Sequence, residues 1–404
     1  MTTRIVIIGG GFGGLEAVFP LKEMLRSSAE ITLIDRSAYH AFIPSIHLIV
    51  SGKMTTEEIR VPLKTVLGAS GVRFVQDEVT AVDAAKREII TRGATLPYDY
   101  LVFAAGAGPN FFKIKGAAEF SLPFRSPEDA ERIRARLLEL LAEHDRFRIV
   151  LAGAGTEGVE AAGEVVDLIR SEERGEDLAA GKIVVELIEG KSRILPDFLH
   201  DVQERAGQYL AGQGVSALTG DRIVEVRKDR VVLGSGLERE ASVLIWTCGI
   251  QPSQLIADLP LAKDSWGWLK VNDRLHSPDD DRIYAIGDAV SVHTDDGPLA
   301  LQRLAYHAQD QARVAALNIV ADIRGGKKVV YSPKTKPQLI SIGKDMGLFT
   351  LEDRVASGAW VVALKKAVER KHLMTCLTKP VSSTLWSLFP GVGFAQRLRA
   401  KLPL

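Results

Sequence analysis

The feature that most constrains this chain is an apolar run near its start that meets a cluster of glycines and is followed by a helix-compatible stretch. Gly9, Gly11 and Gly14 fit the pattern G-x-G-x-x-G. In that pattern the first glycine permits a tight turn, the second lets the backbone approach a pyrophosphate, and the third lets a helix pack closely on its strand. The next predicted strand, residues 31–34, ends in Asp35, where an acid that binds a ribose is expected. The stretch therefore predicts a dinucleotide-binding βαβ unit, with an ordinary βαβ turn as the alternative.

The same unit recurs in the middle of the chain. A predicted strand at residues 147–152 leads into a second G-x-G-x-x-G, made by Gly153, Gly155 and Gly158, and the strand after the following helix ends in Glu189. Two independent copies of strand, glycine turn, helix, strand and terminal acid are far more specific than one, and they imply two dinucleotide sites. An acid at this strand end accepts hydrogen bonds from both ribose hydroxyls and repels a 2′-phosphate, which favours NADH over NADPH.

Composition excludes several other classes of protein. The chain has 404 residues, of which 46% are hydrophobic and 25% charged, as in ordinary globular proteins, and its length predicts two or three domains. The net charge is zero, so we expect no nucleic-acid partner. Cys248 and Cys376 lie far apart and have no metal-type spacing, so we expect no metal site and a reducing compartment. We expect neither a signal peptide nor a membrane-spanning helix, because no uncharged apolar run reaches the required ~18 residues.

Further elements follow from apolar periodicity. Helices are predicted at residues 126–143, where Ser126 can cap and Pro127 suits the first position, and at residues 301–319. Asp288 follows a predicted strand and precedes a predicted helix, so its carboxylate could bind a sugar-alcohol chain, cap that helix, or do both. Further strands are predicted at residues 72–75, 79–82, 87–90, 100–105, 183–188, 241–245 and 283–286.

Two segments have unusual composition. The loop at residues 39–47 is too apolar for a plain linker, and it could cover the ring end of a flavin or close the edge of the sheet. Residues 360–404 contain eight Lys or Arg but a single acid, Glu369, and the last part of the chain interleaves basic residues with large apolar ones. This pattern is typical of an interfacial membrane anchor. The alternative is a helix pair that packs on the core or on a dimer partner. The apolar residues are Leu385, Trp386, Leu388, Phe389, Phe394, Leu398 and Leu402.

Together these motifs resemble the flavoproteins with two dinucleotide-binding domains. Within that group the chain is similar to the flavin:quinone oxidoreductases, chiefly the type II NADH dehydrogenases, whose relatives are the sulfide:quinone oxidoreductases. The resemblance covers roughly residues 1–350 and depends on five ordered motifs, at residues 9–14 with Asp35, 104–106, 153–160 with Glu189, 246–249 and 285–288.

The resemblance implies an α/β fold with two Rossmann-like domains. It implies a discontinuous FAD-binding domain at residues 1–112 and 273–325, an inserted NAD(H)-binding domain at 113–272, and a C-terminal domain at 326–404 that ends in the amphipathic tail. Glu160, His307 and Gln311 are the implied catalytic residues. The implied NADH-binding residues are Gly153, Gly155, Gly158 and Glu189. The implied FAD-binding residues are Gly9, Gly11, Phe12, Gly13, Gly14, Asp35, Arg36, Ala105, Gly106, Gly287 and Asp288.

The chain departs from the NADH dehydrogenases at two places. Their helix facing the quinone usually carries a glutamine pair, whose positions here hold Tyr306 and Gln311; Tyr306 and residues 42–45 are closer to the sulfide:quinone oxidoreductases. Cys248 stands where the NADH enzymes usually have alanine, and we expect it to be a buried strand cysteine.

The cysteines discriminate between possible mechanisms. Residues 38–52 contain no C-x4-C pair, so disulfide reduction is excluded. The positions that match the cysteines of sulfide:quinone oxidoreductases hold Thr156, Glu157 and Leu339, so that mechanism lacks its nucleophiles. We therefore expect an enzyme that transfers a hydride from NADH to FAD and two electrons to a membrane quinone without pumping protons.

The expected location is the cytoplasmic face of the cell membrane, as a peripheral protein, and a homodimer is compatible with these features. Glu160, His307 or water bound to Gln311 could deliver the protons that the quinone requires. The alternatives are a sulfide:quinone-type oxidoreductase and a soluble NADH-dependent flavoprotein for electron transfer.

Overall fold

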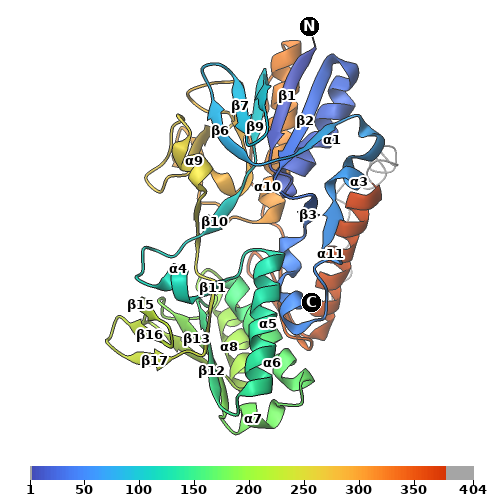
Figure 1. Cartoon of the computed structure of the whole chain (residues 1–404). Helices are drawn as coiled ribbons and strands as arrows, with labels where there is room; N and C mark the ends of the chain where they lie inside the picture. Colours follow the sequence, from blue (N-terminus) through green and yellow to red (C-terminus); the bar gives the residue numbers. More distant parts are fainter. Residues whose placement is uncertain (1, 379–404) are drawn as a thin grey trace.

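Two five-stranded parallel sheets, each with a glycine turn at its centre, form the frame of the computed structural model, which describes residues 2–378 (Figure 1). The first sheet has the order β21-β9-β1-β2-β5 and the second the order β11-β18-β12-β13-β14. The chain leaves the first sheet after β9, builds the second, and returns at β21. The α/β fold predicted from the sequence is confirmed. The strands of the first sheet are β1 (Thr3–Ile8), β2 (Ala29–Asp35), β5 (Arg73–Gln76), β9 (Tyr100–Phe103) and β21 (Ile283–Ala285).

Helices cover these sheets because the central strands are apolar on both faces. In β1 the four residues before the glycines are all buried, as expected for a parallel strand between helical layers. Helix α1 (Phe12–Leu25) follows the first glycine turn and packs along α10 (Ala305–Arg324). The second sheet contains β11 (Leu122–Pro123), β12 (Phe147–Ala152), β13 (Ile183–Glu189), β14 (Val215–Thr219) and β18 (Val243–Trp246), with helices α5 (Pro127–Glu143), α6 (Thr156–Ser171) and α8 (His200–Gly212).

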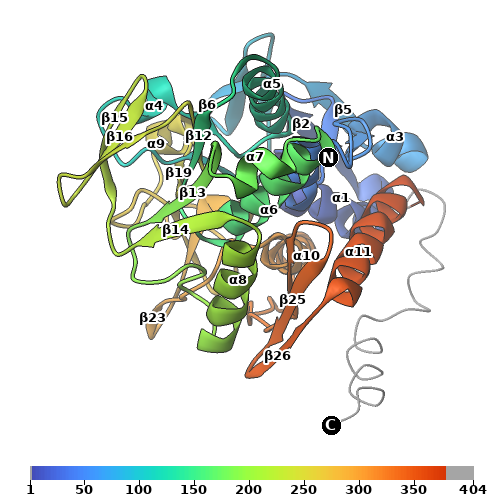
Figure 2. The ribbon, with the colours of Figure 1, turned by 90° about the horizontal axis from the view of Figure 1, so that it is seen from below.

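Smaller elements connect the two sheets. Strand β10 (Ala107–Pro109) pairs with β19 (Ile250–Pro252) where the chain passes between them. The apolar loop after β2 forms β3 (Tyr39–Ala41) and leads into α2 (His47–Ser51), which packs against α5 and α6 of the second sheet. Helix α11 (Ala359–Thr378) lies beside a three-stranded antiparallel sheet (Figure 2), made of β24 (Gln338–Ile342), β25 (Met346–Leu351) and β26 (Arg354–Ser357).

The remaining short elements lie around this frame. Two further antiparallel sheets contain β6 (Val79–Asp83), β7 (Glu88–Thr91) and β8 (Thr95–Pro97), and β15 (Ile223–Arg227), β16 (Arg230–Leu233) and β17 (Glu238–Glu240). A strand, β4 (Arg60–Pro62), pairs with β3. The short helices are α3 (Leu63–Leu67), α4 (Ala117–Phe120), α7 (Gly175–Ala179) and α9 (Gln254–Asp258). Within residues 2–378, no helix combines the length and the apolar character needed to cross a membrane.

Local sequence predicted some of these elements better than others. Ser126 caps α5, and Pro127 takes the first helical position, as the sequence predicts; Asp129 completes a capping box with Ser126. The helix predicted after Asp288 is wrong: a short 3₁₀ turn leads into β22 (Val290–Thr294), which pairs with β20 (Leu269–Asn272), and β23 (Gly297–Pro298) completes that sheet. The alternating burial along β22 requires the strand. Helix α10 begins four residues later than predicted and ends at Arg324.

The third glycine of the first turn should contribute to the stability of the fold. A Cβ on Gly14 would lie 1.8 Å from the carbonyl oxygen of Gly9, so the helix would have to move. We expect Gly14→Ala to lower the free energy of unfolding by about 1–3 kcal/mol, measured by chemical denaturation. Gly212→Ala is the matched control, because Gly212 ends α8 with no heavy atom within 4 Å of its Cβ position. Equal stability of the two variants would contradict this account.

Candidate functional site

The two glycine turns have the same geometry. The first glycines, Gly9 and Gly153, have φ angles of 104° and 95°, which L-residues with side chains rarely adopt. Each donates its N–H to the last apolar residue of the neighbouring strand, at 2.8 Å. A Cβ on Gly158 would lie 2.0 Å from the carbonyl oxygen of Gly153, as at the first turn. Both turns therefore meet the packing requirements of the motif.

The middle glycines face open space. No heavy atom lies within 4 Å of a Cβ built on Gly11 or on Gly155. Each of these glycines is the N-cap of its helix, and because glycine has no side chain, no N-cap side chain occupies the N–H groups of the first turn. The N–H groups and positive dipole ends of α1 and α6 are therefore oriented as an anion-binding site requires. A pyrophosphate fits both turns.

The acids at the strand ends are held by the turns themselves. Asp35 accepts hydrogen bonds from the N–H groups of Gly10 (2.5 Å) and Ser37 (2.7 Å). Glu189 accepts them in the same way from Ala154 and Lys191, both at 2.9 Å. Burial raises the pKa of Asp35, and the two N–H groups act against that rise. Each carboxylate is thus fixed beside its glycine turn before any ligand binds.

The other residues predicted to bind FAD lie around the first sheet. Gly106 follows β9 with φ 65° and open space at its Cβ position, whereas a Cβ on Gly13 would lie 3.1 Å from Ile286. The ring of Phe12 packs against that of Phe42, with centroids 5.6 Å apart. Of the four remaining predicted residues, Ala105 follows β9, and Gly287 and Asp288 lie on the turn after β21, whereas Arg36 is exposed.

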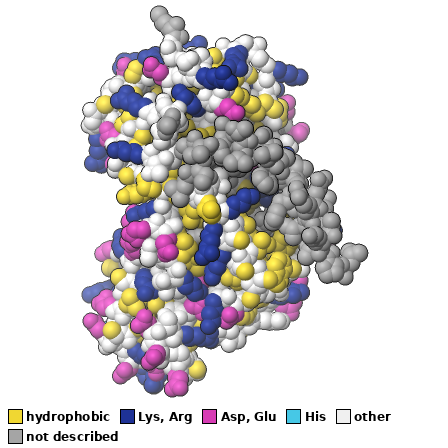
Figure 3. All heavy atoms as spheres, turned by 90° about the vertical axis from the view of Figure 1, so that its right-hand side faces the viewer, with side chains coloured by type: hydrophobic (Ala, Val, Ile, Leu, Met, Phe, Trp, Pro, Cys, Tyr) yellow, Lys and Arg dark blue, Asp and Glu magenta, His cyan; other side chains and the backbone are white. Residues whose placement is uncertain are grey.

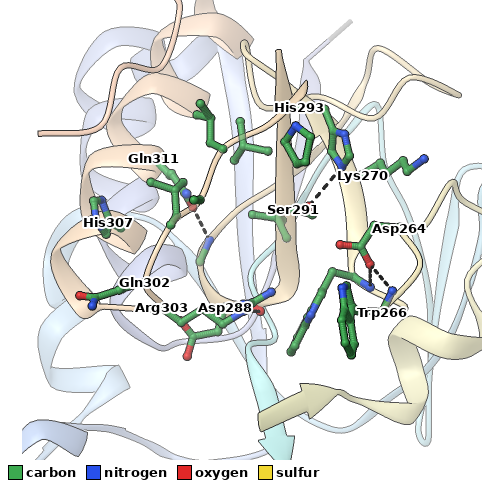
Figure 4. Close-up of a pocket in the computed structure, with 18 of the residues that line it drawn as sticks. Asp264, Trp266, Lys270, Asp288, Ser291, His293, Gln302, Arg303, His307 and Gln311 are labelled. Carbon is green, nitrogen blue, oxygen red and sulfur yellow. Dashed lines mark hydrogen bonds between the residues drawn. The ribbon is translucent and has the colours of Figure 1, made fainter. Parts of the chain in front are cut away.

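A pocket of about 630 Å³ opens beside the turn that carries Gly287 and Asp288 (Figure 4). It contains His307 and Gln311, which extend from α10. The side-chain oxygen of Gln311 accepts a hydrogen bond from the N–H of Gly287 at 2.7 Å, so this glutamine holds the turn. His307 Nδ1 lies 3.0 Å from the hydroxyl of Tyr331, and burial lowers the pKa of His307, so the ring is neutral at pH 7.

Charged groups in and beside this pocket contact one another, and the sequence predicted only Asp288 among them. The guanidinium of Arg303 lies 3.7 Å from the centroid of the Trp268 ring and donates from Nε to the carbonyl oxygen of Asp288. Arg125 lies 3.7 Å from the Asp288 carboxylate, whose pKa is raised by burial. Neither Arg303 nor Trp268 belongs to a recognisable motif, so only the folded chain reveals their contact.

Glu160 belongs to a separate buried cluster outside this pocket. Its Oε1 accepts hydrogen bonds from the N–H of Ser341 (2.9 Å) and from Nζ of Lys365 (2.5 Å). His47 Nδ1 lies 3.7 Å from its other oxygen. Burial, and then the charge of Lys365, hold the pKa of His47 well below its usual range, so the histidine is neutral. The structure therefore brings His307 and Gln311 together and places Glu160 elsewhere.

Cys248 packs beneath the second glycine turn. Its sulfur lies 2.9 Å from the position of a Cβ on Gly153. Burial, followed by the nearby charge of Glu189, raises the pKa of Cys248 to about 12. The thiol stays protonated at neutral pH, so it is a poor nucleophile. The expectation of a buried strand cysteine is therefore wrong in its details, because Cys248 is half-buried and lies in the turn between β18 and β19.

Comparison with known proteins identifies the family. Residues 3–312 match the pyridine nucleotide-disulphide oxidoreductases. The chain belongs to this family. It is 28% identical over 355 residues to a type II NADH:quinone oxidoreductase of Mycobacterium tuberculosis, covering 82% of this chain and 75% of that protein. The resemblance predicted from the motifs is thereby confirmed.

Solved structures of two proteins have the same fold. A sulfide:quinone oxidoreductase from Aquifex aeolicus superposes with a TM-score of 0.83 and 20% identity, covering 96% of this chain and 95% of that one. NDH2 from Plasmodium falciparum in complex with NADH gives 0.82 and 20%, covering 95% and 99%. At this level of identity the likeness establishes the architecture alone.

A buried carboxyl near Glu160 predicts a pH dependence. Burial raises the pKa of Glu369 from 4.5 to about 7, and, among residues 2–378, its Oε1 has no hydrogen-bond partner. Between about pH 4.5 and about pH 7, Glu369 keeps its proton in the folded state but releases it in the unfolded chain. The free energy of unfolding therefore falls as the pH rises through this range. We expect a loss of about 3 kcal/mol in the free energy of unfolding from about pH 5 to about pH 8.

Glu369→Gln should remove most of this dependence, because the amide does not titrate. The exposed Glu240→Gln is the control and should keep the wild-type dependence. Urea unfolding at both pH values measures the effect. A wild-type slope unchanged in Glu369→Gln would show that this carboxyl is not its source.

Proposed function

We propose that this protein is an FAD-dependent NADH:quinone oxidoreductase that does not pump protons. The observation that carries the proposal is the pair of geometrically equivalent glycine turns, each with open space at its middle glycine, in a chain of this family. The relative from Mycobacterium tuberculosis is a type II NADH:quinone oxidoreductase by name, which supports NADH as the electron donor and a quinone as the acceptor. FAD, when bound, would accept a hydride from NADH and pass two electrons to a quinone.

The two turns have different proposed ligands. We assign FAD to the first turn, in a domain of residues 1–112 and 273–325, with Asp35 on the adenosine ribose and Asp288 near the ribitol. We assign NADH to the second turn, in residues 113–272, with Glu189 on the ribose. The charge of Lys191 would attract the 2′-phosphate of NADPH and so opposes the preference for NADH, but Asp197 pairs with Lys191 at 3.0 Å and partly neutralises that charge.

The pocket beside Gly287 is the proposed place of the ring chemistry. Its volume lies within the ~300–1,000 Å³ range of small-molecule sites. Gln311 positions the Gly287 N–H there, and neutral His307 can accept a proton at its pocket-side nitrogen. Glu160 stays a proposed catalytic residue, but it lies outside this pocket, and its Oε1 accepts a hydrogen bond from Lys365 within a buried cluster.

The thiol chemistry disfavours the sulfide reading. Cys248 has a raised pKa, and Glu157, at a position where a sulfide oxidoreductase needs a cysteine, forms an ion pair with Arg125 at 2.7 Å. NADH therefore remains the favoured electron donor. The other alternative, a soluble NADH-dependent flavoprotein for electron transfer, predicts that the protein does not bind membranes, so a membrane-binding assay distinguishes it from the proposal.

We propose peripheral attachment to the cytoplasmic face of the cell membrane. Exposed on α11 are Trp360, Val368 and Met374, together with the basic Lys366 and Lys371. Figure 3 shows hydrophobic and basic side chains side by side on the face that carries this helix. Apolar contact and attraction to anionic lipids act together in such surfaces. The amphipathic tail predicted from residue 381 onward lies outside the described residues.

The paired middle glycines test the cofactor assignment. Because a side chain at Gly11 or Gly155 would enter open space, Gly11→Val and Gly155→Val should both fold. Gly11→Val should purify without flavin colour. Gly155→Val should remain yellow but fail to bleach on addition of NADH, while dithionite still bleaches it. Absorbance spectroscopy of the two variants and the wild type measures both effects.

Each variant is the control of the other. The proposal requires that only Gly11→Val loses the flavin, and that Gly155→Val keeps the flavin but loses its reduction by NADH. A fully flavinated Gly11→Val protein would overturn the FAD assignment. Rapid NADH reduction of Gly155→Val would overturn the NADH assignment.

A chain ending at Thr378 tests the membrane proposal. It should remain folded, bind FAD and reduce a water-soluble quinone, but lose activity with a long-chain quinone. Each basic residue removed should weaken binding to anionic liposomes by about 1 kcal/mol, so co-sedimentation at low salt should fall strongly. If the full-length protein itself remains in the supernatant at low salt, the membrane proposal is wrong.

A further inference from the structure

The loop after β2 and the end of α11 bring three metal-ligating side chains together. His40 and His372 are separated by 332 residues, yet their Nε2 atoms lie 3.2 Å apart. The sulfur of Cys376 lies 3.5 Å from the same nitrogen of His372. The three donor atoms all lie within 4.8 Å of one another. His40 and Cys376 are buried, at 1% and 2% exposure, and His372 is half-buried.

These separations match a tetrahedral zinc site. Zinc binds imidazole nitrogen at about 2.0–2.1 Å and thiolate sulfur at about 2.3 Å. Tetrahedral angles then place two nitrogens about 3.3 Å apart and a nitrogen and a sulfur about 3.6 Å apart. The two separations from His372 Nε2, 3.2 Å to His40 and 3.5 Å to Cys376, fall close to these values.

One nitrogen of His372 cannot donate to His40 and also accept from Cys376. His40 Nδ1 lies 3.0 Å from the carbonyl oxygen of Gly10, an acceptor, so it carries a proton and leaves Nε2 as an acceptor in the neutral ring. His372 Nε2 then donates its single hydrogen to His40, so it cannot accept from the thiol of Cys376, whose sulfur could only share that hydrogen as a weak acceptor. If His40 is charged instead, the one lone pair of His372 accepts from His40, with the same result. One metal ion accepts lone pairs from all three atoms.

The surroundings of the three ligands suit a metal. His372 and Cys376 are four residues apart on one helix, so both lie on the same face of α11. The contact between His40 Nδ1 and the Gly10 carbonyl fixes the orientation of the ring, as second-shell partners of zinc-bound histidines do. The rings of Phe12 and Phe42 pack against His372, with centroids at 5.1 and 4.9 Å, and limit water access from that side.

We propose that His40, His372 and Cys376 bind one zinc ion. The two imidazoles and the thiolate are borderline and soft donors, which favour zinc over magnesium or calcium. The ion would fasten α11 to the first glycine turn through His40 and Gly10. The proposal departs from the expectation of no metal site, which considered cysteine spacing alone. It is independent of the proposed redox function, and neither fails with the other.

Cobalt substitution tests the site directly. The purified full-length protein is stripped with a chelator, dialysed and titrated with Co²⁺ alone, and its spectrum is followed beyond the flavin bands. We expect one equivalent to produce the intense d–d bands of a tetrahedral site and a thiolate-to-cobalt charge-transfer band, and one equivalent of Zn²⁺ to remove them. The matched variants are Cys376→Ser and Cys248→Ser, each of which removes one of the two cysteines.

The proposal requires the charge-transfer band to vanish in Cys376→Ser and to persist in Cys248→Ser. Because Cys376 is buried, His372→Gln provides a second variant at a half-exposed position; it should bind cobalt at least tenfold more weakly with an unchanged circular dichroism spectrum. Absence of the bands in the wild type, or their persistence in both Cys376→Ser and His372→Gln, would overturn the site.

Discussion

This structure depends on one close contact that occurs twice: the third glycine of each turn, in the first turn of its helix, packs against the carbonyl oxygen of the first glycine. At Gly14 and at Gly158 a methyl group would lie within about 2 Å of that oxygen, so each helix begins directly against its strand. This closeness orients the first-turn N–H groups toward the open space beside the middle glycine. It also lets turn N–H groups fix Asp35 and Glu189. Both dinucleotide sites therefore arise from one packing arrangement.

Helix α11 connects the two units that these turns define. Lys365 extends from it to Glu160 on α6, and His372 extends to His40 beside the first glycine turn. A buried ion pair is costly to desolvate and contributes to stability mainly when its hydrogen bonds are complete. Glu160 meets that condition through the N–H of Ser341 as well as Lys365. The helix thus holds charged and polar groups of both units in fixed positions.

Sequence reasoning succeeded where the physics is local. The glycine turns, the central strands and the Ser126 cap of α5 follow from residues that are neighbours in the chain, and the structure confirms them. The helix predicted after Asp288 failed because pairing between β22 and β20 overrode the local pattern. Contacts across long separations could not be predicted, since no pattern in one sequence links His40 to His372 or Glu160 to Lys365. The sequence therefore predicted the two glycine turns of the candidate site but not the contacts within its buried clusters.

An anaerobic titration tests the proposed function most directly. The purified protein is reduced with one equivalent of NADH, and the flavin absorbance is recorded before and after addition of a water-soluble quinone. The account predicts full bleaching by NADH, little bleaching by NADPH at the same concentration, and recovery of the oxidised spectrum by one equivalent of quinone. A flavin that NADH does not bleach, or that stays reduced after the quinone is added, would contradict it.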